Sequence, residues 1–107
     1  MEKKSLYKMH ADVCKALAHA IRIETIDVLK DKELTFGEIA GETGVAKSNL
    51  SQHLTVMVQK GILNHRKKGL HVYYKLSSTK VYNAFYMMRE VLKERLQKQN
   101  ELLKNFK

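Results

Sequence analysis

Apolar residues in the first third of the chain recur at the spacing of amphipathic helices. Between Lys8 and Ala18 they fall every three or four positions, and the segment Ile21–Leu29 repeats the pattern. Residues three or four apart lie on one face of an α-helix, so each segment predicts a helix with one buried side. The polar run Asp31-Lys32-Glu33 then ends the second helix.

Two further helices are predicted, with a short connection between them. Thr35-Phe36-Gly37-Glu38 matches a capping box, in which threonine and glutamate satisfy each other's backbone N–H groups. That helix should end near Gly41 to Gly44. The next helix, from about Lys47, has an apolar face made of Leu50, Leu54, Met57 and Val58. Short helices joined in this way predict a helix-turn-helix over about residues 35–60.

A β-hairpin is predicted directly after these helices. The runs 62–66 and 70–76 flank Lys67-Lys68-Gly69, and the second run alternates Val72, Tyr74 and Leu76 with polar residues. The pattern predicts a wing over residues 62–76 with one face packed inward and a basic tip. A plainer interpretation is that lysines at the tip only protect an edge strand from aggregation.

The C-terminal segment, over about residues 79–105, carries a long apolar stripe. Its members follow a three-four spacing: Val81, Phe85, Met88, Leu92, Leu96, Gln99 and Leu103. A small domain has little core surface to cover such a stripe, so we expect a twofold dimer formed by this helix and the N-terminal helix, where Val13 and Leu17 contribute. The alternative is that the stripe folds back on the wing of its own chain.

Composition narrows the partners of this single predicted domain, residues 1–107. The 107 residues carry a formal charge of +9, and no acidic residue occurs between Glu42 and Glu90. Such a surface favours a polyanion, either nucleic acid or an anionic membrane, although it could also be a solvated surface without a partner. No apolar run is long enough to span a bilayer, and no signal-peptide core follows Met1, so we expect a cytoplasmic protein.

The predicted second helix of the helix-turn-helix suits the major groove of DNA. Serine, asparagine and glutamine can pair with base edges, and lysine, arginine and tyrosine can contact phosphates. The candidate base-reading residues are Ser48, Asn49, Ser51, Gln52 and His53. The candidate phosphate contacts are Lys47, Lys60, Arg66, Lys67, Lys68 and Tyr73. Alternatively, the polar side chains of this helix only solvate its outer face.

Four segments in order resemble the ArsR/SmtB family. They are Lys15–Arg22, Gly37–Ala40, Ser48–Leu54 and Gly69–Leu76, and the similarity runs from about His10 to the C-terminal helix. The resemblance implies a winged helix-turn-helix homodimer that represses transcription. It also implies release from the operator when an inducer, often a metal ion, binds.

The metal positions of that family are not matched here. Leu34-Thr35-Phe36-Gly37 offers no thiolate where arsenic and lead sensors carry a cysteine pair, and residues 79–107 contain no histidine or aspartate where zinc and nickel sensors carry ligands. Ala20 stands where the family often has proline, and Ala46 where it often has a capping serine. We therefore predict no metal, no cofactor and an unidentified inducer.

His10 and Cys14 are the remaining candidates for a sensing site. They lie four positions apart on a predicted helix, so a dimer could bring two such pairs together around a metal, or Cys14 could respond to oxidation. The more ordinary interpretation is a small apolar side chain in a packing face. One cysteine excludes an intramolecular disulfide.

The sequence therefore predicts a mostly helical winged helix-turn-helix protein that dimerises through its N- and C-terminal helices and represses transcription from double-stranded DNA. No glycine-rich phosphate loop, paired-carboxylate motif or nucleophile motif predicts an enzyme. The alternative is a winged-helix module that binds protein or RNA, which would show weak duplex binding beside tight binding to its other partner.

Overall fold

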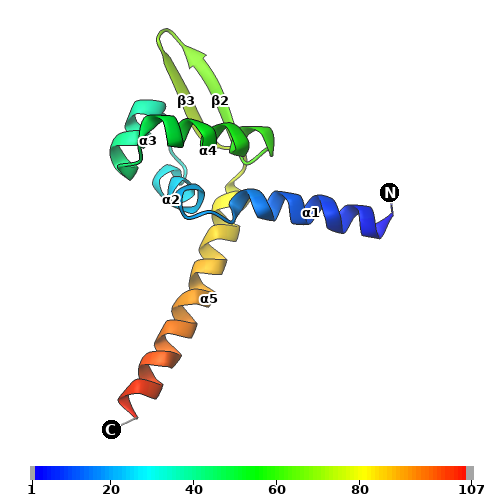
Figure 1. The fold of residues 1–107 in the computed structure, drawn as a ribbon, viewed down its shortest axis with the longest axis vertical. Coiled ribbons are helices and arrows are strands. Elements are labelled where there is room, and N and C mark those ends of the chain that lie inside the picture. Colours follow the sequence, from blue (N-terminus) through cyan, green and yellow to red (C-terminus); the bar gives the residue numbers. More distant parts are fainter. Residues whose placement is uncertain (1, 106–107) are drawn as a thin grey trace.

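In the computed structural model, which describes residues 2–105, five helices are combined with a three-stranded antiparallel sheet (Figure 1). The elements in chain order are α1 (Lys3–Leu17), α2 (Ala20–Leu29), β1 (Leu34–Thr35), α3 (Phe36–Thr43), α4 (Lys47–Gln59), β2 (Leu63–Lys68), β3 (His71–Leu76) and α5 (Thr79–Lys104). The strand order is β1-β3-β2. The predicted fold class, mostly helical with a small hairpin, is confirmed.

The core lies where α2, α3 and α4 meet the base of the hairpin. Leu29, Ile39 and Leu54 are each 0% exposed, and they come from three different helices. Ile62, Leu63 and Leu76 extend the same cluster to the foot of the wing. The hairpin is thus fixed at its base by the core that holds α4, which sets the position of the wing relative to that helix.

Local hydrogen bonds define where the helix-turn-helix begins and turns. The Thr35 hydroxyl accepts from the backbone N–H of Glu38 at 3.1 Å, and the Glu38 carboxylate accepts from that of Thr35 at 3.0 Å, which completes the capping box. These bonds lower the pKa of the Glu38 carboxyl. Helix α3 ends at Gly44, whose φ of 69° lies in the left-handed region that glycine adopts without strain. Helix α4 begins at Lys47, and its N-cap residue Ala46 offers no side-chain cap.

Two features differ from the sequence-based expectation. The strand β1 was not predicted: Leu34 and Thr35 pair with Tyr74 and Tyr73 of β3. Thr35 is extended because it precedes a helix as its N-cap, and the partner strand lies far along the chain, so no local pattern reveals the pairing. Helix α1 also begins at Lys3, well before Lys8, because its exposed first turns need no apolar periodicity to stay helical.

Helices α1 and α5 are two arms that leave the body: α1 extends to one side, and α5 runs away from the wing (Figure 1). Helix α5 contains no buried residue, and Ala16 is the buried residue of α1. The radius of gyration is 16.9 Å, whereas a compact domain of this length has about 13 Å. Val81 and Phe85 at the start of the α5 stripe pack against the core. From Met88 onward the stripe is exposed and does not fold back on the wing.

Candidate nucleic-acid interface

Helix α4 divides its side chains between the core and one exposed polar surface. Leu50, Leu54 and Met57 are 0% exposed and anchor the helix. Its opposite face carries four of the five predicted base-reading residues, which are all exposed: Ser48, Asn49, Ser51 and Gln52. Lys47 is exposed at the first position of the helix, beside them. The first turns of α4 thus present hydrogen-bonding side chains next to a positive charge, the combination that reads bases and contacts phosphate.

The wing is an exposed basic hairpin. Strands β2 and β3 pair from Leu63 with Leu76 to Lys68 with His71, and Gly69, with a φ of 62°, allows the turn. Lys67 and Lys68 are exposed at the tip, where Leu70 is also 96% exposed. In Figure 1 the hairpin rises beside α4 and extends beyond it. Polar helix and basic wing therefore face solvent within one half of the molecule.

Arg66 does not contribute a free charge to the wing. Its guanidinium donates to both carboxylate oxygens of Glu33, Nε to Oε2 at 3.0 Å and Nη2 to Oε1 at 2.6 Å, and lies 4.8 Å from the centre of the Tyr73 ring. The hydrogen bond from Arg66 lowers the pKa of the Glu33 carboxyl. This bidentate pair ties β2 to the segment before β1, so the positive charge of the tip rests on Lys67 and Lys68.

Lys60, another predicted phosphate contact, is paired with Asp12 of α1 at 2.7 Å. Both side chains are substantially exposed, 40% for Lys60 and 55% for Asp12. Exposed pairs of this kind contribute about 0–1 kcal/mol, so a phosphate can compete for the lysine.

His53 lies apart from the other four candidate base readers. It is 9% exposed, and its Nδ1 accepts from Nε of Arg22 at 3.1 Å. The pKa of the His53 imidazole is lowered, first by burial and then by the nearby His19 and Arg22. A buried ring committed to a neighbouring helix is not placed to read a base, so we do not retain His53 among the base-reading candidates.

Comparison with known proteins shows which family this chain belongs to. The family model described as "Bacterial regulatory protein, arsR family" matches residues 19–65. Rv0081, an uncharacterized HTH-type transcriptional regulator of Mycobacterium tuberculosis, is 32% identical over 93 residues, which cover 86% of this chain and 82% of the relative. The chain belongs to the ArsR family of transcriptional regulators.

Other ArsR-family relatives have stated roles. The transcriptional activator HlyU of Vibrio cholerae is 40% identical over 67 residues, covering 63% of this chain and 62% of HlyU. The transcriptional repressor SdpR of Bacillus subtilis is 32% identical over 68 residues, covering 64% of this chain and 76% of SdpR.

Solved structures show the same fold. The crystal structure of Rv0081 has a TM-score of 0.80 at 30% identity, covering 92% of this chain and 98% of that one. The solution structure of the homodimeric winged helix-turn-helix DNA-binding domain of Mb0332 from Mycobacterium bovis also has a TM-score of 0.80, at 29% identity, covering 89% of this chain and 88% of that one. The winged helix-turn-helix prediction is confirmed.

The arms of this ArsR-family chain form an apolar groove of about 550 Å³. Residues of α1, α2 and α5 line it, and five of the predicted dimer contacts are among them: Leu17, Val81, Phe85, Met88 and Leu92. Val13 and Leu96 are exposed on the same two helices, by 41% and 53%. Cys14 also lines the groove, whereas His10 is exposed outside it. Their roles in sensing remain predictions.

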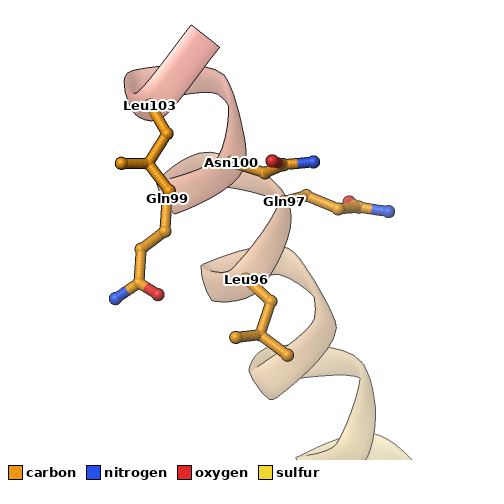
Figure 2. Close-up of a pocket in the computed structure, with 5 residues that line it drawn as sticks. All are labelled: Leu96, Gln97, Gln99, Asn100 and Leu103. Atoms are coloured by element: carbon orange, nitrogen blue, oxygen red, sulfur yellow. The ribbon is translucent and has the colours of Figure 1, made fainter. Parts of the chain in front are cut away.

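The far end of α5 carries a second, shallower depression. Figure 2 shows its five side chains, which all come from this one helix: Leu96, Gln97, Gln99, Asn100 and Leu103. Gln97 and Asn100 point to one side of the helix and Leu103 to the other. Because no second element closes this depression, it belongs to an uncovered helix surface.

Residues 2–105 contain neither a metal-binding cluster nor a membrane-spanning helix. In that part of the chain, no three His, Cys, Asp or Glu side chains are grouped so that they could hold a metal ion. None of its helices is long and apolar enough to cross a membrane.

Sequence reasoning missed two residues that shape the site. Glu33 was interpreted only as part of a polar break, yet it binds Arg66. Arg22 was noted within a family segment without a role, yet it contacts both α4 and the end of α1. The Arg66–Glu33 and Arg22–His53 contacts join residues 33 and 31 positions apart, so no local signal reveals them.

Proposed function

We propose that this ArsR-family regulator is a homodimeric, cytoplasmic repressor that binds operator DNA through α4 and the wing, and is not an enzyme. The observation that carries the proposal is the exposed polar face of α4 beside the lysines of the wing, both fixed by one core. Ser48, Asn49, Ser51 and Gln52 would read bases, while Lys47, Lys67 and Lys68 would hold phosphates.

The uncovered arms support the homodimer. The groove lined by Leu17, Phe85 and Met88 is apolar and open in one chain, and a second copy would cover it together with the rest of the α5 stripe. The homodimeric state of the Mb0332 domain supports this assignment. A twofold dimer would present two α4 helices to successive major grooves, about 34 Å apart on one side of B-DNA.

Repression is the simpler regulatory direction for this molecule. The described helices and strands form the proposed DNA-binding surface and the two arms. A dimer bound to an operator can block transcription simply by occupying the DNA. The relative SdpR is a repressor, whereas HlyU is an activator. We propose that an unidentified inducer releases the dimer from its operator.

Fluorescence anisotropy tests this function. A labelled duplex from the upstream region of this gene is titrated with protein at fixed salt, beside a scrambled duplex of the same composition. We expect at least a tenfold preference for the upstream duplex, with the affinity falling as salt rises.

Equal binding of the two duplexes would contradict operator recognition. Tight binding to single-stranded RNA with weak binding to both duplexes would instead identify an RNA-interaction module. Loss of the preference on oxidation, restored by reduction, would assign a switch to Cys14; the variant Cys14→Ser is the matched control.

A further inference from the structure

Three side chains form a cluster at the corner where α1, α2 and α4 meet. Arg22 of α2 donates from Nε to Nδ1 of His53 on α4 at 3.1 Å, and from Nη1 to the carbonyl oxygen of Ala16 in α1 at 3.2 Å. The His19 and His53 rings lie with their centres 4.2 Å apart. One guanidinium thus connects the helix predicted to read DNA with the end of an arm.

The hydrogen bonds define the protonation state of His53. An arginine side chain only donates, so Nδ1 of His53 must carry a lone pair, and a neutral ring then has its proton on Nε2. His19 has the same requirement, because its Nδ1 accepts from the backbone N–H of Ile21 at 3.1 Å as the N-cap of α2. Protonation at either Nδ1 removes an acceptor.

A proton on His53 would also place a positive charge beside the cationic side chain of Arg22. The groups that act on its pKa are Arg22, which is always cationic, and His19. On the other elements that pack against α4, Asp12 of α1 is paired with Lys60, and Arg66 of β2 is paired with Glu33. In the described part of the chain no carboxylate contributes to the His53 environment that would compensate a proton there.

We propose that Arg22 and His53 form a positioning latch, with His19 packed on it, which adds to the core in holding α4 in its DNA-binding orientation while His53 is uncharged and is lost in acid. His53 is then a positioning residue and not a reader of bases. This inference rests on the proposed function only where it concerns DNA, since the latch itself is a property of the free protein.

The direction of the pH effect follows from linkage. An imidazole released from the latch has an ordinary pKa of about 6.5, whereas the pKa of latched His53 is lower. The latch is therefore fully stable above pH 6.5 and is weakened as the pH falls through the interval between the two values. Between pH 7.5 and pH 5.5 the released state gains up to about tenfold in population relative to the latched state.

The test in DNA binding uses the upstream duplex at fixed salt and compares the wild-type protein with His53→Gln, which offers an amide oxygen to Arg22 and does not titrate. We expect the ratio of affinities at pH 7.5 and pH 5.5 to be larger in the wild type than in His53→Gln, by at most about tenfold. Dividing by this variant removes any effect of pH that does not depend on His53. His10→Gln, which changes a histidine outside the cluster, should keep the wild-type ratio. Equal ratios in the wild type and His53→Gln would overturn the proposal.

The variant His53→Leu separates hydrogen bonding from packing. Leucine fills the site but cannot accept from Arg22, so at pH 7.5 it should bind the upstream duplex at least threefold more weakly than His53→Gln. If His53→Leu binds as tightly as His53→Gln, the contact does not position α4.

Histidine side-chain NMR of the free wild-type protein decides the latch without DNA. We expect His53 at pH 7.5 to have an unprotonated Nδ1 and a protonated Nε2, and to titrate below pH 6.5. A protonated Nδ1, or titration at or above 6.5, would overturn the latch. If instead the tautomer is as expected but neither duplex is preferred at any pH, the proposed function fails while the latch stands.

Discussion

Helices α4 and α5 are both amphipathic, but only α4 buries its apolar face within the chain. Leu50, Leu54 and Met57 of α4 are 0% exposed, whereas the 26 residues of α5 include none that is buried. In α4 the buried face fixes the orientation of the polar one, so its polar side chains form a defined surface. In α5 the apolar side chains themselves are the surface, and they require a second molecule.

The largest expected effect tests the buried face of α4. Leu54→Ala should lower the free energy of unfolding by about 2–5 kcal/mol, because it removes contacts from a fully buried position and leaves a cavity. Urea denaturation measures this loss. Thr55→Ala, an exposed neighbour on the same helix, should change stability by no more than about 0.5 kcal/mol. Equal effects of the two changes would mean that α4 is not anchored as described.

The second prediction concerns the uncovered stripe of α5. Leu96→Glu should weaken dimerisation by about 3 kcal/mol, roughly 100-fold in Kd, because a dimer would bury the new carboxylate without a partner. Sedimentation velocity over a concentration series measures the effect. Gln97→Glu adds the same charge at the next position, outside the three-four spacing of the stripe, and should perturb the dimer much less. Dissociation by both variants would indicate a charge effect that does not depend on the stripe.

The third prediction divides the DNA surface into two roles. Gln52→Ala should reduce discrimination between upstream and scrambled duplexes by about 1–3 kcal/mol, because a base-reading amide is lost. Lys67→Ala should weaken both duplexes alike and make the salt dependence shallower, because a phosphate contact is lost. Anisotropy titrations at several salt concentrations separate the two. If both variants lose specific and scrambled binding equally, the division of roles is wrong.

The smallest expected effect lies in neither surface. Lys30 has a φ of 52° at the end of α2, in the left-handed region that disfavours a residue with a Cβ. Lys30→Gly should therefore raise the free energy of unfolding by about 0.5–1 kcal/mol, after the extra entropy of glycine in the unfolded chain is subtracted. Dimerisation should not change. A loss of stability in thermal unfolding would show that the Lys30 side chain contributes more than its backbone costs.

The elements that the sequence predicted well are those with local signals. The capping box of Thr35 and Glu38 is formed by residues three positions apart, and the turn at Gly69 is contained in one short hairpin. The exposed polar face of α4 follows directly from helical periodicity. In each of these three cases the residues that form the cap, the turn or the helix face lie close together in the sequence.

The elements that were missed depend on distant partners. The strand β1 exists because Leu34 pairs with Tyr74, and Arg66 is occupied because Glu33 lies across from it. The position of His53 in a polar run predicts base reading, but its spacing of three from Leu50 and four from Met57 puts it on the buried face of α4.

Chemical-shift mapping of the labelled protein with the upstream duplex tests the central division most directly. We expect backbone amides over residues 47–52 and at the wing tip, residues 67–70, to shift on DNA binding, while those of the α5 stripe from Leu92 to Leu103 stay unchanged. Shifts concentrated along α5, with α4 and the wing unaffected, would contradict the assignment of α4 to DNA and of α5 to the second protomer.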